Sequence, residues 1–497
     1  MGAIFNRSVE SMTLASQTAR SIDCAYAVTR PDHPVARNRS IRFDGERITS
    51  VIDGAAGRAA PLFAMPALVN AHDHGRPIRT SSIGAGGKPL ESWLHHLALI
   101  PSVDPYLAAV VALSNAALGG AGVVMMHYTR TQGFTDLPTE AAEVARAARD
   151  VGVRVGFAVA MRDRNPLTYG PSEPILSMLS DVARAEIERR LLRPPLSPKE
   201  FVALVDDVAG AAAGPTFEVQ YGPNGVQWCS DALLQAIAEA SQRSGRRVHM
   251  HLLETRYQRA WADANFPGGM VKHLDEIGLL SPRLSLAHCV WARPDELELL
   301  AERGVTLVNN NSSNLHLRSG MAPVARMLER GCRVALGIDG CALDEDDDAL
   351  RELRLAHLLH VGTGFKVAAS RTQILHIALV NGRRSVTNRD DGGAIAEGMP
   401  ADLLLLDWAA IDDDGLQENL DPLDLLFSRA RAAHIRELIV GGRSVVKDGA
   451  VTGVDLAAAR TAVIAQMRAG MRDNAALAAA LPALERAIAS QLEPGCC

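Results

Sequence analysis

The segment 67–77, ALVNAHDHGRP, places His72 and His74 at the end of an apolar run. Side chains alternate between the two faces of a β-strand, so two histidines separated by one residue point to the same face. Two imidazoles so placed can bind one metal ion, although chance pairs also arise among the 15 histidines of the chain. A catalytic metal site therefore requires further ligands elsewhere in the sequence.

Seven other apolar runs follow, and several of them also end in polar residues. The eight runs cover residues 62–70, 122–128, 153–160, 216–221, 246–252, 284–288, 305–310 and 332–339. At or near their ends stand His72, His74, His127, Tyr221, His249, His251, His288, Asn309–Asn311 and Asp339. Amphipathic segments with Ser or Thr near the start and Gly near the end separate the runs, which is typical of helices. The pattern predicts an α/β fold, a (β/α)8 TIM-type barrel whose catalytic groups lie at the carboxyl ends of the strands.

A metal site can be assembled from these strand ends. Zinc in catalytic sites takes about three protein ligands from histidine and carboxylate and keeps a position for water, whose pKa falls to about 7. A suitable set is His72, His74, His251 and Asp339. Because neutral imidazoles and a carboxylate suit Zn or Fe(II), we expect one divalent metal ion per chain, with zinc favoured over iron.

Glu254 follows His251 by three residues, where the apolar run 246–252 gives way to a helical pattern. A carboxylate at this position can lie beside the water and shuttle protons without binding the metal. The alternative is a glutamate that favours the start of a helix through the helix dipole. We expect Glu254 to be catalytic.

The composition limits the classes of function. The chain has 497 residues, of which 47% are hydrophobic and 22% charged, so it can bury a large core. A formal charge of −6, without basic clusters interleaved with aromatics, argues against a nucleic-acid partner. No apolar run reaches the roughly 18 residues that span a bilayer, and the first residues resemble neither a signal peptide nor a myristoylation motif. The expected location is the cytoplasm, without a membrane partner.

The cysteines argue against both a disulfide framework and a thiolate zinc site. They are Cys24, Cys229, Cys289, Cys332, Cys341, Cys496 and Cys497, an odd number with no C-x-x-C pair. We expect reduced, buried thiols, with lipidation of the terminal pair as an alternative.

Several segments together resemble the amidohydrolase superfamily over nearly the whole chain. VNAHDHGRP resembles its first metal motif, HLLET its His-x-x-Glu motif and LAHCVW its sixth-strand histidine motif. NNNSSNLHLRSGMAPV resembles the Ser-Asn loop after strand seven, and LGIDG resembles the aspartate motif of strand eight. Within the superfamily, the chain is similar to the mononuclear-metal branch that contains guanine deaminase, adenosylhomocysteine-type deaminases and triazine hydrolases.

The resemblance implies a role for each motif residue. It assigns the metal to His72, His74, His251 and Asp339. Glu254 would transfer protons, His288 would polarise or orient the substrate and the water, and Asp339 would also accept a proton from the water. No lysine stands at the end of the fourth strand, where two-metal relatives carry a carbamylated one, and this favours a single metal.

Both chain ends contain short strand-like stretches broken by Asp-Gly and Gly-Gly pairs. They resemble the small β-sandwich domain that accompanies this barrel in the superfamily. The expected domains are residues 1–61 as the N-terminal part of the sandwich, 62–390 as the barrel, 391–455 as the C-terminal part of the sandwich and 456–497 as a helical tail.

Departures from the family pattern bear on the substrate. Relatives that act on nucleosides carry a histidine where this chain has Asn224, which puts a ribose contact in doubt. Trp93 and Trp228 could stack on a flat ring whose edge Gln227 reads, or either ring could pack in the core. The expected substrate-binding residues are Trp93, His127, Asn224, Gln227, Trp228 and Asn314.

An acidic run, residues 344–348, follows Asp339 after a short loop. Acidic residues before a helical pattern favour the positive end of the helix dipole and are usually solvated. The alternative is that one of them faces the pocket and attracts a cationic substrate of the amidine or guanidine type.

Together these features predict a metal-dependent hydrolase that acts on a small molecule. The favoured reaction is deamination of an amino-substituted nitrogen heterocycle, with no ribose required and with ammonia released. The alternative is hydrolysis of an amide, urea or carbamate bond, or displacement of another ring leaving group, by the same residues. A non-enzymatic scaffold is disfavoured because the full ligand set is present. We also expect a homodimer or higher homo-oligomer.

Overall fold

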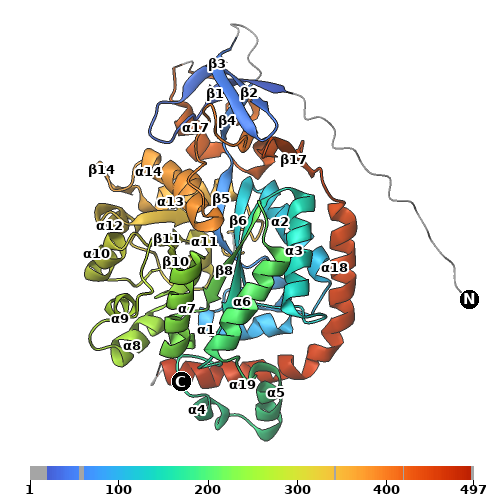
Figure 1. Ribbon diagram of the computed structural model, residues 1–497, viewed down its shortest axis with the longest axis vertical. Helices are drawn as coiled ribbons and strands as arrows, with labels where there is room; N and C mark the ends of the chain where they lie inside the picture. Colours follow the sequence, from blue (N-terminus) through green and yellow to red (C-terminus); the bar gives the residue numbers. More distant parts are fainter. Residues whose placement is uncertain (1–18, 55–60, 341–342, 418, 494–497) are drawn as a thin grey trace, which may run out of the picture.

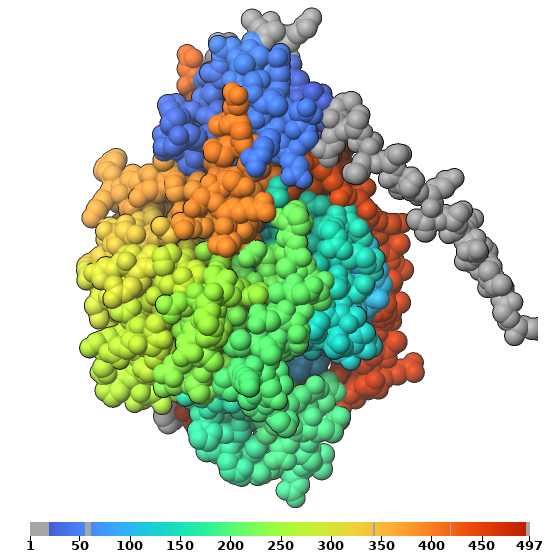
Figure 2. Space-filling model, in the orientation of Figure 1, coloured from blue at the N-terminus to red at the C-terminus, as the bar shows by residue number. Residues whose placement is uncertain are grey.

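The computed structural model describes residues 19–54, 61–340, 343–417 and 419–493. It contains two large β-sheets with helices around them (Figure 1). One sheet is a parallel barrel, and the other, here called the end-strand sheet, is built from strands of both chain ends. The end-strand sheet projects beyond the barrel at one end of the molecule (Figure 2). The predicted (β/α)8 barrel with an additional domain from both chain ends is confirmed.

The barrel consists of eight parallel strands whose spatial order follows the sequence. They are β5 (Leu68–Asp73), β6 (Ala121–Tyr128), β7 (Arg154–Met161), β8 (Phe217–Pro223), β9 (Val248–Leu252), β10 (Leu284–His288), β11 (Thr306–Asn309) and β12 (Arg333–Leu336). The residues just beyond β12 meet β5, because Ile338 N and Asp339 N donate to His72 O at 3.2 and 2.8 Å. The last strand and the first strand are thereby joined at the end of the barrel that carries the predicted metal ligands.

The end-strand sheet has the spatial order β18-β17-β16-β15-β4-β1-β2-β3. Its strands are β1 (Arg20–Ala27), β2 (Ala36–Asp44), β3 (Arg47–Asp53), β4 (Leu62–Pro66), β15 (Leu403–Asp407), β16 (Ile435–Val440), β17 (Arg443–Lys447) and β18 (Ala450–Val451). Ile41, Phe43 and Leu403 pack in one apolar core, so strands from both chain ends share it. The domain boundaries at residues 61, 390 and 455 stay a prediction.

The first apolar run, residues 62–70, forms two strands rather than the single one expected. β4 pairs with β1 and β15 of the end-strand sheet, whereas β5 pairs with β6 of the barrel. Only Ala67 separates them, and its N–H donates to Asp402 O at 3.0 Å. Both strands are buried, so the apolar run continues across the switch between sheets and gives no sign of it.

Helices follow the barrel strands and cover them. They are α2 (Pro105–Leu118), α3 (Leu137–Val151), α5 (Asp181–Leu191), α6 (Pro198–Ala212), α7 (Asp231–Ser244), α8 (Arg256–Asn265), α9 (Met270–Glu276), α10 (Pro294–Glu302), α11 (Asn311–His316), α12 (Val324–Glu329), α13 (Ala349–His360), α14 (Arg371–His376) and α15 (Gly382–Thr387). The shorter elements include α1 (Leu90–His96), α4 (Glu173–Leu176), α16 (Trp408–Ile411), α17 (Pro422–Arg429), β13 (Gly362–Thr363) and β14 (Lys366–Val367). Caps follow the sequence signals: Ser230 Oγ accepts from Leu233 N at the start of α7, and Gly245 ends it with a φ of 73°.

Two further helices, α18 (Leu456–Gly470) and α19 (Ala475–Leu492), wrap the barrel. α18 packs along α2, and α19 packs against α1 and α5 at the end opposite the end-strand sheet (Figure 1). In the described ranges, no helix is long and apolar enough to cross a membrane. The described cysteines, Cys24, Cys229, Cys289 and Cys332, are buried free thiols, as expected, while Cys341, Cys496 and Cys497 lie outside the described residues.

Candidate metal centre

The four predicted metal ligands converge at the carboxyl ends of β5, β9 and β12. His74 Nε2 lies 3.0 Å and His72 Nε2 lies 3.3 Å from Asp339 Oδ1. His251 brings its Nε2 to 3.4 Å from His74 Nε2. The side chains of His72, His74 and Asp339 offer ligand atoms that all lie within 4.8 Å of one another. Residues from three separate strands thus form one compact donor set.

Hydrogen bonds leave a bare ring nitrogen on two of these histidines. His74 Nδ1 donates to His127 O at 2.9 Å, and His251 Nδ1 donates to Asn224 O at 2.7 Å, because a carbonyl can only accept. In a neutral imidazole the proton on Nδ1 leaves Nε2 without one. Two such nitrogens 3.4 Å apart repel each other unless a cation lies among them.

The other two donors fit the same cation. His72 Nε2 and Asp339 Oδ1 are buried and have no hydrogen-bond partner among the described residues. Buried polar atoms are rarely left without a partner, so their convergence indicates a bound group that they would ligate. Three imidazoles and one carboxylate are suited to zinc or Fe(II).

The electrostatics favour metal binding over protonation. Burial lowers the pKa of His72 to about 4 and lowers that of His251 well below its usual value, so both rings are neutral, as ligands must be. Burial alone would raise the pKa of Asp339, but the charge and hydrogen bonds that His72 and His74 offer when protonated hold it well below its usual value, and a bound cation would act on the carboxylate in the same direction. The carboxylate is therefore ionised at neutral pH.

The backbone is strained where two of the motif residues leave their strands. Asp339 has a φ of 63° and His288 has a φ of 75°, both in the left-handed region. This conformation costs a residue other than glycine about 1–3 kcal/mol, and such strain gathers at functional sites. At Asp339 the bond from its N–H to His72 O helps to hold the turn.

Asp73, which separates the two predicted ligand histidines, is a structural clamp. Its Oδ1 accepts from His74 N and Gly75 N at 2.7 and 2.8 Å, and its Oδ2 accepts from Asn70 Nδ2 and Gly340 N at 2.8 and 3.1 Å. These four donors come from both sides of the junction between β5 and β12. Asp73 therefore fixes the two loops that carry His74 and Asp339.

Glu254 lies in the same buried space as His288. Its Oε2 is 3.7 Å from His288 Nε2, and its Oε1 accepts from Ser319 Oγ at 3.3 Å. Burial raises the pKa of Glu254 to about 7. A carboxyl group with such a pKa can take up and release a proton near neutral pH, as a shuttle must.

The loop after β11 supports these side chains. His288 Nδ1 lies 2.9 Å from Asn314 Oδ1, and Ser313 Oγ donates to Asp339 Oδ2 at 2.6 Å. Asn314 Nδ2 is buried without a hydrogen-bond partner in the described part of the chain. Asn314 therefore orients His288 with one end of its amide and has a free donor at the other.

The remaining predicted binding residues fall into two groups. Asn224 Oδ1 and Gln227 Nε2 are buried atoms that lack a hydrogen-bond partner within the described ranges. His127 lies instead among the metal-site histidines: its ring stacks on His251 at 4.9 Å between centroids, and its Nε2 lies 2.9 Å from Gly222 O. Its Nδ1 has no hydrogen-bond partner in the described part of the chain, and His127, His72 and His251 each offer a ring nitrogen within 4.8 Å of the others.

The two tryptophans are buried with neighbours of their own. Trp93 packs with Leu90 and Leu317, and the Arg76 guanidinium lies 4.8 Å from its ring centre. Trp228 lies 5.8 Å from Tyr169 between ring centroids and donates from Nε1 to a main-chain carbonyl. Stacking of both rings on one substrate stays a prediction.

His249 was noted at its strand end but received no role from the sequence. Its Nε2 lies 2.7 Å from His72 Nδ1. The signal for it was present, because His249 and His251 share one face of β9, and their spacing is the one that His72 and His74 have at the end of β5. The sequence did not show that His249 would contact His72, which lies on another strand.

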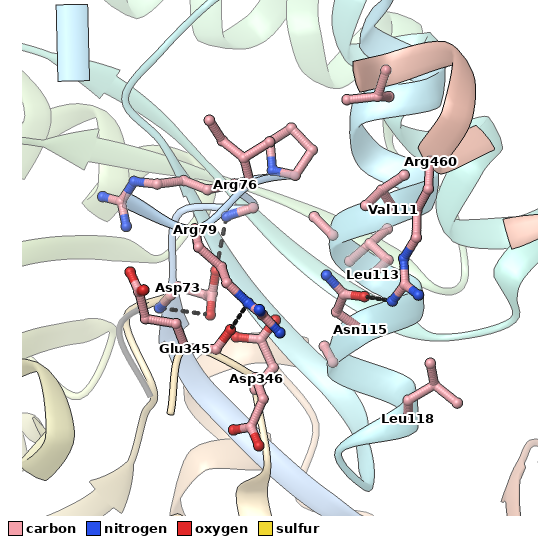
Figure 3. A pocket seen from close by; sticks show the side chains of 18 of the residues that line it. Asp73, Arg76, Arg79, Val111, Leu113, Asn115, Leu118, Glu345, Asp346 and Arg460 are labelled. Atoms are coloured by element: carbon pink, nitrogen blue, oxygen red, sulfur yellow. Dashed lines mark hydrogen bonds between the residues drawn. The ribbon is translucent and has the colours of Figure 1, made fainter. Parts of the chain in front are cut away.

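A separate cavity of about 400 Å³ lies beside the metal centre. Apolar side chains of α2 and α18 line one part of it, and charged residues of the loops after β5 and β12 line the other (Figure 3). The charged residues are Asp73, Arg76, Arg79, Glu345, Asp346, Asp347 and, from α18, Arg460. The cavity is lined by similar numbers of arginines and carboxylates, so its charge does not favour a cationic ligand.

The acidic run serves in part as a helix cap. Asp348 accepts from Arg351 N at 3.0 Å at the start of α13, as the capping interpretation predicted. Arg351 also pairs with Asp344 and Asp346. Glu345, Asp346 and Asp347 do line the cavity, but Arg76, Arg79 and Arg460 line it as well.

Comparison with known proteins gives matches over most of the chain. Residues 63–445 match the Amidohydrolase family. The 5'-deoxyadenosine deaminase of Methanosarcina barkeri is 29% identical over 445 residues, covering 87% of this chain and 93% of that protein. An adenosine deaminase from Xanthomonas campestris with bound zinc has a TM-score of 0.73 at 23% identity, covering 91% of this chain and 98% of the other. An atrazine chlorohydrolase from Arthrobacter aurescens, solved with zinc and atraton, has a TM-score of 0.74 at 22% identity, covering 90% and 99%. The two solved structures share their fold with this chain.

Proposed function

Since this chain belongs to the amidohydrolase family, we propose that it is a metal-dependent aminohydrolase that deaminates an amino-substituted nitrogen heterocycle. The observation that carries the proposal is the convergence of His72 Nε2, His74 Nε2 and Asp339 Oδ1, with the buried Glu254 and His288 beside Asp339. Two of the matched proteins are named deaminases, which supports deamination over other hydrolyses.

In this proposal His72, His74, His251 and Asp339 would hold one metal ion. Zinc is favoured, because two matched structures contain it, and Fe(II) is the alternative. When bound, the ion would lower the pKa of a water molecule so that hydroxide is available near neutral pH. His127 also offers a ring nitrogen within 4.8 Å of those of His72 and His251, close enough to take part in binding.

The protein's own side chains then move the protons. Water adds to the ring carbon that bears the amine, and Glu254 accepts one of its protons and gives it to the adjacent ring nitrogen. Asp339 accepts the second proton, which passes to the amine, and the C–N bond breaks to release ammonia. The product carries an oxo group and a ring N–H, so one water is consumed for each ammonia released. His288 orients the substrate from the position that Asn314 gives it.

The unpartnered amides support recognition of a heterocycle edge. Asn224 Oδ1 can accept a hydrogen bond, whereas Gln227 Nε2 and Asn314 Nδ2 can donate one. A site with buried polar groups of this kind rejects analogues that leave them unpaired by a larger factor than an apolar pocket can. We therefore propose that they read amino, oxo or ring-nitrogen groups.

Two finer expectations belong to the same proposal. A homodimer or higher homo-oligomer is expected, and sedimentation of the purified protein tests it. A cytoplasmic location is expected, and fractionation of the source cells tests it. Neither affects the chemistry above.

The deciding experiment measures ammonia release from purified, metal-replete protein. The panel contains purines, pterins, pyrimidines, triazines and guanidino compounds, together with amides, ureas and carbamates. Release of ammonia from a heterocycle with formation of its oxo product supports the proposal. Turnover confined to acyclic amides, ureas or carbamates would replace it with the alternative hydrolysis.

A further inference from the structure

A buried chain of polar groups lies behind His72, on the side of the ring away from Asp339. His72 Nδ1 is 2.7 Å from His249 Nε2, His249 Nδ1 is 2.7 Å from Ser285 Oγ, and Ser285 Oγ donates to Val248 O at 3.3 Å. The residues His72, His249 and Ser285 are each 0% exposed. Bulk water therefore cannot take the place of His72, His249 or Ser285 in these hydrogen bonds.

The positions of the protons follow from the last acceptor. A carbonyl oxygen only accepts, and Ser285 has a single hydroxyl proton, which it gives to Val248 O. In that arrangement Ser285 Oγ accepts the proton of His249 Nδ1, whereas a hydroxyl turned toward His249 Nδ1 would leave Val248 O unused and put the proton of His72 on Nε2. A neutral imidazole has one N–H, so His249 Nε2 is bare and accepts from His72 Nδ1. His72 is left with a bare Nε2, which faces Asp339 Oδ1 at 3.3 Å.

His72 differs from the other ligand histidines in this respect. His74 and His251 are held by the main-chain carbonyls of His127 and Asn224, which no substitution removes. His72 is held by side chains alone on its Nδ1 side. Its tautomer is therefore set by the residues at positions 249 and 285.

We propose that His249 and Ser285 are positioning residues for the metal, which fix His72 in the tautomer and orientation that offer Nε2 as a ligand. The opposite tautomer would place a proton on Nε2 and remove one of the four donors. Residues that hold metal-binding histidines in this way commonly change metal affinity by about 10–100-fold when replaced. The inference rests on the metal site of the proposed function but not on the reaction proposed there.

The test compares zinc affinities of the metal-free full-length protein, titrated against a competing chelator. His249→Met keeps a side chain of similar length but offers no strong acceptor, whereas His249→Gln offers an amide oxygen to His72 Nδ1. Ser285→Ala removes the acceptor for His249 Nδ1. Ser114→Ala is the matched control, because Ser114 is also 0% exposed but its hydroxyl has no partner in the described part of the chain.

We expect zinc affinity to fall about 10–100-fold in His249→Met, to recover to within about threefold of the parent in His249→Gln, and to fall about tenfold in Ser285→Ala. Ser114→Ala should bind zinc as the parent does. The absorption spectrum of the cobalt-loaded protein should change in His249→Met and Ser285→Ala but not in His249→Gln, because it reports the ligand set rather than stability.

Equal affinities of His249→Met and His249→Gln would overturn the proposal, since packing alone would then explain the effect. Parent-like affinity of Ser285→Ala would also overturn it. Should His249→Met fail to fold, the pair Ser285→Ala and Ser114→Ala still decides, because each removes one buried hydroxyl. The titration contains no substrate, so a protein that deaminates nothing on the panel can still pass or fail this test.

Discussion

Glu254 and His288 face each other in a buried space, with Oε2 and Nε2 3.7 Å apart and neither side chain more than 2% exposed. Neither is part of the proposed metal set, yet His288 Nε2 also lies 3.9 Å from Asp339 Oδ2. Chemistry at this place is therefore governed by groups that bulk water does not screen.

Glu254→Gln tests the proton shuttle. The amide keeps the size of the side chain but cannot accept a proton, so kcat should fall by about 10²-fold or more. Metal content should stay at the parent level, because Glu254 is not among the proposed ligands. Steady-state kinetics and metal analysis of the same preparation check this, and loss of the metal would show that Glu254 is a ligand or a support for one.

The pH dependence of kcat/KM should reflect the pKa of Glu254. Burial raises this pKa from its usual value to about 7, and the shuttle must be ionised to accept a proton from water. The rate should therefore fall about tenfold for each pH unit below 7 and level off above it. Glu254→Gln should lack this acidic limb in its residual activity, and an unchanged limb in that variant would assign the titration to another group.

Metal analysis should give about one transition-metal ion per chain. Removal by a chelator should abolish activity and also lower the melting temperature, because a ligand that binds only the folded state stabilises it by about 2.7 kcal/mol at a hundred times its Kd. Zinc should restore both properties. Two tightly held ions per chain with a modified lysine between them would contradict this prediction.

The substrate should be a planar heterocycle with an exocyclic amine, and a ribose should not be required. Two matched proteins are named for nucleosides, so the panel must contain adenosine, 5'-deoxyadenosine and adenine side by side. We expect the kcat/KM for a free heterocycle to lie within about a hundredfold of that for the best nucleoside. A larger difference would require a site built to hydrogen-bond the ribose. Activity confined to nucleosides would show that another residue replaces the histidine absent at Asn224.

Asp402→Asn should destabilise the protein strongly. Asp402 binds Arg154 at 3.1 Å, Arg383 at 2.5 Å and Gly441 N at 2.6 Å, and its side chain is only 7% exposed. Removal of the charge leaves the buried Arg154 without its carboxylate and leaves Arg383 with Asp391 alone, at a cost of roughly 3–5 kcal/mol in the free energy of unfolding. Urea unfolding measures this, with Asp32→Asn as the control: its exposed pair with Arg30 should contribute less than about 1 kcal/mol. Similar losses in both variants would refute the role given to Asp402.

The sequence predicted the parts of the site that depend on local periodicity. His72 and His74 share a face because strand side chains alternate, and the eight runs marked the barrel because each strand is buried. The switch between sheets at Ala67 left no trace, because the residues on both sides are apolar. The contact of His249 with His72 was also hidden, since it joins strands that are not neighbours in the sheet, and no spacing along the chain encodes such a pair.

The pairing of β4 with β15 also constrains the order in which the chain folds. It joins Pro66 to Leu403 and Leu62 to Asp407, across about 340 residues that contain the entire barrel. Contacts between successive barrel strands close much shorter loops, and loop-closure entropy makes short loops faster to form. The barrel and the hairpins within each chain end can therefore form from neighbouring strands, whereas the pairing of β4 with β15 must wait until both chain ends are present. Until β15 arrives, the edge of β4 that it will cover is a strand edge open to wrong partners, so this junction is exposed to mispairing during folding.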